Sequence, residues 1–256
     1  IWGKIIGGAA GFAIGGPLGA ILGVMAGGAL EKKLKFKHTN FNNIKIDHNQ
    51  KQQIFALSII VLSAKLAKSD GVVTKDEINA FKEKFRIPSN ELPKVSKIFN
   101  EAKKSVYGYE QVAGQIGILF SDNKILLEEL LNNLFFIAAS DGKISISEVD
   151  FLRSISKSFK FNEEEFQRIF QTNVKNKEAD PYKVLGVKRD DSDDIIRKKW
   201  INLNKEHHPD NLIAKGMPQE FIERANDELS SINLAYDKIK EIRGINWYLM
   251  IFQFKI

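Results

Sequence analysis

The chain has 256 residues, which is long enough for two soluble domains and additional segments. It contains no cysteine, so structural disulfides and thiolate metal sites are excluded. The net charge of +6 comes from lysines that are scattered among acidic residues, without the interleaved aromatic residues of a nucleic-acid-binding surface. Nucleic acid is therefore not an expected partner.

The N-terminal segment, residues 1–31, is a predicted transmembrane anchor. No charged residue occurs between Ile5 and Leu30, a run that is long enough to cross a bilayer as a helix. Pro17 lies in the middle of this run, where a membrane helix tolerates a kink. A cleaved signal peptide would have a shorter apolar core that ends at a small-residue cleavage site. A glycine-rich hairpin that is soluble or lies on the membrane surface is the alternative interpretation.

Glycine recurs at every fourth position of this segment and forms a stripe along one side of the predicted helix. A second helix can approach such a stripe closely, so we expect a homodimer that forms through the transmembrane helix. The stripe consists of Gly7, Gly11, Gly15, Gly19, Gly23 and Gly27.

Lysines set the expected orientation of the anchor. Only Lys4 precedes the apolar run, whereas several lysines follow it in the basic and polar linker, residues 32–49. By the positive-inside rule, the bulk of the chain is therefore cytoplasmic and the N-terminus is periplasmic. The lysines after the run are Lys32, Lys33, Lys35 and Lys37.

The first residues resemble a known family. The run Trp2-Gly3-Lys4-Ile5-Ile6-Gly7, with the glycine stripe after it, is similar to the N-terminus of DjlA-type proteins. These are membrane-anchored, DnaJ-like proteins of Gram-negative bacteria. The resemblance implies a single-pass protein of the bacterial inner membrane.

A duplicated helical pattern fills residues 50–173. In each copy an apolar helix ends in Ser-Asp-Gly, at 69–71 and at 140–142. An amphipathic helix then begins with a capping box, which pairs Thr74 with Glu77 and Ser145 with Glu148. This pattern resembles the all-helical TerB-like domain, which is named for tellurite-resistance proteins and also occurs in DjlA-type proteins.

The carboxylates of the two copies have two interpretations. Asp70 with Glu77, and Asp141 with Glu148, occupy equivalent places, and two such pairs offer oxygen ligands to one divalent cation. The resemblance to TerB-like domains implies metal binding at positions of this kind. In the interpretation that we favour, Asp-Gly makes the turn and each glutamate caps its helix, so that no metal and no cofactor are needed.

After a short connector, residues 174–179, a helical hairpin is predicted over residues 180–241. Asp180 and Pro181 begin a short helix, and Gly186 suits the left-handed turn that ends it. A basic helix follows from about Ser192 to His207, and its buried face carries Ile196, Trp200, Leu203 and His207.

A second long helix is predicted from about Pro218 to Tyr236, antiparallel to the first. Pro209 must end the basic helix, which places His208-Pro209-Asp210 in a rigid loop. Together with Asp180-Pro181-Tyr182, Leu185-Gly186-Val187 and the run from Ile232 to Tyr236, these features resemble a J domain. The residues that face the basic helix are Ile222, Ala225, Leu229, Ile232 and Tyr236.

The J-like region implies a co-chaperone that docks on a DnaK-type chaperone and accelerates ATP hydrolysis by that partner. Its expected chaperone-binding residues are Arg197, Lys198 and Lys205, which steer the encounter, and His208, Pro209 and Asp210, which make specific contacts. Ile201 and Asn202 stand where J domains often carry basic residues, which implies weaker or more selective docking.

His207 is expected to pack in the hairpin. His207 and His208 are not expected to bind one metal ion together, because adjacent side chains at a helix end point apart. The apolar tail, residues 242–256, is too short to span a bilayer. It fits packing on the soluble domains, lying at the membrane interface, or a non-native extension.

The sequence predicts no enzyme, because no nucleophile–base pair, phosphate-binding loop or metal signature is present. The predicted fold is all-α: a transmembrane helix, a TerB-like bundle and a J-domain hairpin. The alternative function is a membrane scaffold or envelope-stress signalling protein, with a partner- or metal-binding middle domain and a weak J module.

Overall fold

The computed structural model describes residues 47–69, 82, 85–104, 108–140, 142–173 and 179–245. Every regular element in these ranges is a helix, which confirms the all-α fold class. None of the helices described there is long and apolar enough to cross a membrane. The predicted anchor with its glycine stripe, the carboxylates Asp70, Glu77 and Asp141, and the tail from residue 246 lie outside the described residues.

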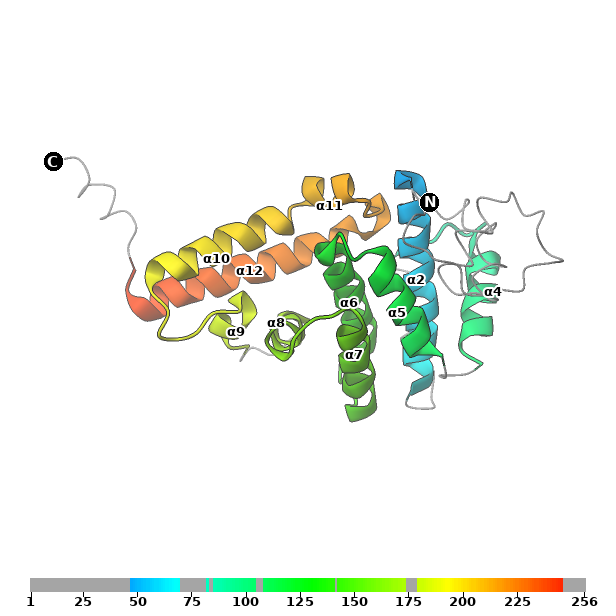
Figure 1. Ribbon diagram of the computed structural model, residues 1–256, viewed down its shortest axis with the longest axis horizontal. Coiled ribbons are helices and arrows are strands. Elements are labelled where there is room, and N and C mark those ends of the chain that lie inside the picture. The colour runs from blue at the N-terminus through cyan, green and yellow to red at the C-terminus, as the bar shows by residue number, and fades with distance from the viewer. Residues whose placement is uncertain are drawn as a thin grey trace.

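The middle domain is a helical bundle around α2 (His48–Ser69). Every residue of α2 from Gln53 to Ala67 is buried, because α4, α5, α6 and α7 all pack against it. Figure 1 shows α2, α5, α6 and α7 side by side, with α4 on the outer side of α2. The bounds are α4 (Leu92–Ala102), α5 (Tyr109–Leu119), α6 (Lys124–Ala138), α7 (Ile146–Ser158) and α8 (Glu163–Asn173).

The start of α7 shows the capping role that the sequence favours for Glu148. The Glu148 amide donates to Ser145 Oγ at 3.2 Å, and the Ser145 amide donates to Glu148 Oε2 at 2.8 Å. This reciprocal pair satisfies two amide donors at the helix start. The corresponding box of Thr74 and Glu77 lies outside the described residues.

The C-terminal hairpin consists of α10 (Asp193–Glu206) and α12 (Ile222–Arg243), which lie antiparallel in Figure 1. The short helix α9 (Pro181–Leu185) packs against both. Asp180 and Ser192 cap α9 and α10 as predicted, and Gly186 has φ +65°. Trp200 stacks on Tyr236 at 4.3 Å and donates from Nε1 to Asn233 Oδ1 at 2.8 Å, which fixes the register of the hairpin.

Two expectations about helix bounds are corrected by the structure. The loop predicted at His208-Pro209-Asp210 is the start of a helix, α11 (Pro209–Lys215), because proline at the first helical position and His208 as N-cap begin a new helix as readily as they end the old one. The second long helix extends past the apolar repeat, which reaches about Tyr236, and ends two residues after residue 241, where the predicted hairpin ends. It continues to Arg243, where Gly244 at φ +63° ends it, and a 3-10 turn (Gln219–Phe221) precedes it.

The hydrophobic core does not divide at the connector between the two regions. The large core of the middle domain also includes Leu212, Met217, Phe221, Ile222 and Ala225, which follow α10 along the chain. A second, smaller core holds the far end of the hairpin, where Leu185, Leu203 and Ile239 meet. The end of the hairpin that carries His208 is thus built into the middle domain, while the other end has its own core.

Candidate functional site

The His208-Pro209-Asp210 segment lies on the surface at the junction of α10 and α11. The side chain of His208 is 56% exposed and that of Asp210 is 90% exposed. Pro209 is half-buried and begins α11. The two polar side chains of the motif are therefore accessible to a partner protein.

Local hydrogen bonds fix the geometry of this segment. The Asp210 amide donates to His208 Nδ1 at 3.3 Å, which makes the imidazole the N-cap of α11. Because Nδ1 accepts this bond, the neutral ring carries its proton on Nε2 and offers it as a donor. Asn211 Nδ2 donates to Glu206 O at 2.7 Å and closes the junction of the two helices.

The middle domain packs against α11 and fixes its position. Leu212 is fully buried in the large core, and Asn123 Nδ2 donates to Lys215 O at 3.1 Å. Gly216 ends the helix at φ +108°, where a Cβ atom would lie 3.3 Å from Lys51 Cβ. Only glycine combines this backbone conformation with such close packing. The exposed motif is thus attached to a helix, α11, that packs closely against the middle domain.

The face of α10 that leads to the motif is basic and exposed. Arg197, Lys198 and Lys205 are all exposed on it, at the positions that the sequence predicts. Ile201, which is 41% exposed, and Asn202 lie between them at helical spacing. The structure therefore brings all six predicted chaperone-binding residues onto α10 and the adjoining start of α11.

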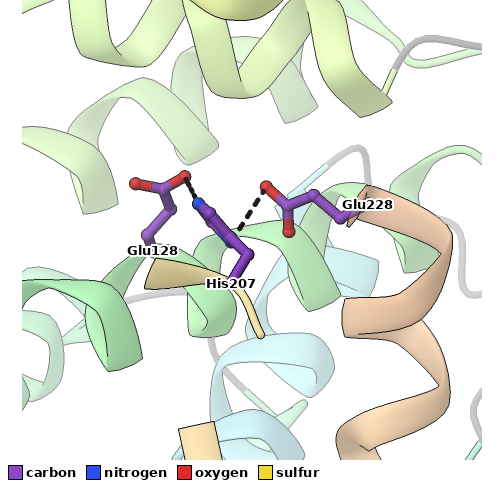
Figure 2. A group of neighbouring side chains, drawn as sticks. All are labelled: Glu128, His207 and Glu228. Atoms are coloured by element: carbon purple, nitrogen blue, oxygen red, sulfur yellow. Dashed lines mark ion pairs between the residues drawn. The ribbon is translucent and has the colours of Figure 1, made fainter. Parts of the chain in front are cut away.

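His207, one residue before the motif, is completely buried, as expected from the sequence, but its neighbours are carboxylates. Its Nδ1 atom lies 2.9 Å from Glu129 Oε1, and its Nε2 atom lies 3.2 Å from Glu128 Oε1. Glu228 Oε1 lies 3.7 Å from Nδ1. Figure 2 shows Glu128 from α6 and Glu228 from α12 pointing toward the imidazole from opposite sides.

Further polar side chains surround this buried cluster. Arg168 of α8 forms an ion pair with Glu128 Oε2, and Asn132 donates to Glu228 Oε2. Asn173 Nδ2 donates to Asn132 Oδ1 at 2.6 Å. The cluster therefore links α10 and α12 of the hairpin to α6 of the middle domain. Through Arg168 and Asn173 it also includes α8.

Burial and charge shift the pKa values of the cluster in different directions. Burial lowers the pKa of His207, but the carboxylates of Glu228 and Glu128 outweigh this and hold it well above its usual value. Burial, followed by the charge of Glu129, raises the pKa of Glu228 to about 8. Burial alone would raise the pKa of Glu128, but Arg168 and His207 outweigh burial and hold it well below its usual value.

Sequence reasoning did not identify this cluster, although a signal is present. Glu128-Glu129 and Asn132-Asn133 are adjacent polar pairs at helical spacing within an otherwise apolar helix, and all four side chains are buried. Buried carboxylates require partners, so such a pattern predicts cations or other polar groups opposite it. The sequence does not show that the partners come from α8, α10 and α12.

Three family models match the chain, one after another. The model of the co-chaperone DjlA transmembrane domain matches residues 1–37, that of tellurite resistance protein TerB matches residues 56–171, and that of the DnaJ domain matches residues 180–248. No solved structure matches the chain.

Relatives named "Co-chaperone protein DjlA" match nearly the whole chain. The protein of Photobacterium profundum is 26% identical and the match covers 95% of this chain and 99% of the relative. Those of Coxiella burnetii and Legionella pneumophila are 25% and 26% identical, each over 95% of this chain and 98% and 96% of the relative. With its three matched segments in this order, along an all-helical structure that exposes His208-Pro209-Asp210, the chain belongs to the DjlA type of membrane-anchored, DnaJ-like co-chaperones.

Proposed function

We propose that this co-chaperone uses its J domain to stimulate ATP hydrolysis by a DnaK-type chaperone. The observation that carries the proposal is the exposure of His208 and Asp210 at the end of the basic face of α10. In this proposal the chain has no catalytic site of its own, because the partner binds and hydrolyses the nucleotide.

The residues of the site have distinct roles in the proposed encounter. Arg197, Lys198 and Lys205 attract an acidic surface of the chaperone and raise the association rate at low salt. Asp210 then accepts charge-assisted hydrogen bonds from a basic side chain of the partner, and His208 donates from Nε2. Pro209 fixes the backbone between them, so that little conformational entropy is lost on binding.

The anchor places this encounter at the cytoplasmic surface of the inner membrane. The match to a transmembrane-domain model supports the anchor. The lysines after the apolar run support this orientation. Protease added to right-side-out vesicles should leave the bulk of the chain intact, whereas protease added to inverted vesicles should degrade it. Degradation from the periplasmic side would contradict the orientation.

We also propose that the glycine stripe from Gly7 to Gly27 pairs two copies of the chain. Single cysteines introduced along the stripe of this cysteine-free chain should form disulfides between copies in the membrane, and cysteines on the opposite face should not. Equal cross-linking on both faces would contradict a dimer through the stripe.

A single-turnover assay with the full chain in detergent or nanodiscs tests the chaperone function. The wild-type protein should accelerate hydrolysis of ATP that is bound to the DnaK-type chaperone of the same organism. Asp210→Asn should reduce this acceleration about tenfold or more, since losing a charge-assisted hydrogen bond at the contact costs about 1.4 kcal/mol or more.

Asp150→Asn is the matched control, because Asp150 is an exposed aspartate on α7 in the middle domain. It should stimulate hydrolysis as the wild type does. If the wild-type protein gives no acceleration, or if Asp210→Asn and Asp150→Asn behave alike, the proposed mechanism is wrong.

A further inference from the structure

Glu128, His207 and Glu228 each present one ligand atom to a shared point between three helices. The three atoms all lie within 4.8 Å of one another. Zinc binds nitrogen and oxygen at about 2.0–2.2 Å with tetrahedral geometry, which separates neighbouring ligand atoms by roughly 3.3–3.6 Å. The distance of 3.2 Å between His207 Nε2 and Glu128 Oε1 is close to this separation. Glu228 Oε1 lies 3.7 Å from Nδ1, on the other side of the ring from Glu128, so the Glu228 side chain must turn toward Nε2 to complete the geometry.

The atoms that point to this place have no hydrogen bonds. Glu128 Oε1, His207 Nε2 and Glu228 Oε1 are buried and have no hydrogen-bond partner in the part of the chain that the structure describes. The residues are 6%, 0% and 0% exposed. His207 Nε2 and Glu128 Oε1 face each other at 3.2 Å as an ion pair, whereas Glu228 Oε1 has only the imidazole Nδ1 at 3.7 Å. Because buried polar atoms are rarely left unsatisfied, Glu228 Oε1 is the atom that most clearly lacks a ligand.

The other polar atom of each residue is already held by a neighbour. Glu129 Oε1 accepts from His207 Nδ1 at 2.9 Å, which leaves Nε2 for the ligand. Arg168 holds Glu128 Oε2, and Asn132 holds Glu228 Oε2, which leaves Oε1 in both carboxylates. Carboxylates and amides that orient metal ligands in this way surround most histidine-containing metal sites.

The charges of the cluster fit a dication. Glu128, Glu129 and Glu228 carry three negative charges when ionised, and Arg168 compensates one of them. Arg224, at the edge of the cluster, also lies 3.9 Å from Asp227, and these two charges cancel. Protons on His207 and Glu228 balance the remaining two negative charges when no metal is bound, and a dication that displaced both protons would balance the same two charges.

We propose that Glu128, His207 and Glu228 bind a divalent transition-metal ion of the zinc type, which joins the J domain to the middle domain. An imidazole in the ligand set favours zinc and its neighbours in the first transition row over magnesium and calcium. The proposed ligand set includes none of Asp70, Glu77, Asp141 and Glu148, of which Glu148 caps α7.

The proposed ion has a direct consequence for the chaperone-binding motif. His207 immediately precedes His208, and Glu228 belongs to α12 of the same hairpin. Glu128 belongs to α6 of the middle domain. An ion held by all three would therefore fix the exposed motif relative to the middle domain.

Zinc titration of the purified full chain tests the proposal without any chaperone. After removal of metal with a chelator, calorimetry with Zn²⁺ buffered at known free concentrations should show one ion bound per chain. Glu228→Gln should weaken binding about 100-fold or more, because even the loss of an outer-shell partner costs 10- to 100-fold. Glu241→Gln, which changes an exposed glutamate of the same helix, should bind as the wild type does.

Spectroscopy on the wild-type protein keeps the proposal testable even if Glu228→Gln fails to fold. X-ray absorption of the zinc-loaded chain should show nitrogen and oxygen ligands at about 2.0–2.2 Å with at least one imidazole. The Nε2 resonance of His207 should shift on zinc addition, while Nδ1 keeps its proton toward Glu129.

Three results would overturn the site. They are no zinc binding by the folded wild-type chain, equal binding by Glu228→Gln and wild type, and absorption spectra without an imidazole ligand. Any of them would mean that protons alone balance the buried charge. Because the titration contains no ATP and no chaperone, its failure leaves the proposed co-chaperone mechanism untouched, and failure of the hydrolysis assay leaves the metal site untouched.

Discussion

His208 has an observed role as the cap of α11 and a proposed role in partner binding, and a single substitution can separate the two. Its Nδ1 atom caps α11, and its exposed ring offers Nε2 to a partner. Asparagine is among the best N-cap residues but lacks the imidazole. His208→Asn should therefore leave the thermal midpoint of unfolding nearly unchanged, as measured by circular dichroism, and should reduce stimulated ATP hydrolysis about tenfold or more.

His208→Ala serves as the comparison, because it removes both the cap and the ring. It should lose the same stimulation and, in addition, about 1 kcal/mol of unfolding free energy. A His208→Asn protein that is as destabilised as His208→Ala would show that the side chain matters mainly for folding.

At the scale of the elements, Arg243 ties the end of α12 to the start of the hairpin. Its guanidinium donates to Tyr182 Oη at 3.1 Å, to Asp193 Oδ1 at 2.6 Å, and to the carbonyls of Arg189 and Asp191 at 2.7 and 2.8 Å. These bonds join α9, the loop before α10, the first residue of α10 and the last residue of α12, and they stabilise the last turn of α12.

Removing this guanidinium should loosen the far end of the hairpin. Arg243→Gln should lower the unfolding free energy by about 1–3 kcal/mol, since several hydrogen bonds to one charged group are lost together. Chemical denaturation measures the change. Lys238→Gln, which alters an exposed cation of the same helix, should cost much less. Equal costs would indicate that only the net charge matters.

At the scale of the whole molecule, the shared core makes the J domain and the middle domain depend on each other. Phe221, which directly precedes α12, packs edge to face on Phe55 of α2 at 5.2 Å and also contacts the ring of Phe85 at 4.9 Å. Phe221→Ala should cost about 3–5 kcal/mol. Hydrogen exchange should accelerate in both α2 and α12, because the cavity opens a core that both helices share.

Ile239→Ala provides the contrast, because Ile239 is fully buried in the small core at the far end of the hairpin. It should accelerate exchange in α9, α10 and α12 and leave α2 protected. If Phe221→Ala affects only one of the two regions, the cores are energetically separate, and the docked arrangement contributes little to stability.

The arrangement in Figure 1 follows from these contacts. The hairpin of α10 and α12 projects from the bundle, and its near end rests on α6 and the start of α2 through α11. In the proposed encounter, a DnaK-type partner would meet the basic face of α10 on the projecting part, close to its fixed base. Docking on a base that is already ordered limits the entropy lost on binding.

The sequence by itself determined the features that short stretches of chain encode. The caps at Ser145, Asp180 and Ser192, the left-handed Gly186 and the hydrophobic faces of α10 and α12 are local, since each depends on residues within one or two helical turns. The same local motifs carried the resemblance to the three families, which the family models confirm.

Only the tertiary structure decided which residues surround His207 and where the cores lie. Glu129 is 78 positions away from His207 along the chain, and nothing in either local pattern states that the two meet. Likewise, Phe221 belongs by sequence to the J-like region but is buried in the core of the middle domain. Local periodicity specifies which face of a helix is buried. Long-range packing of whole helices decides what that face packs against. The buried charged cluster could therefore be identified only from the tertiary structure.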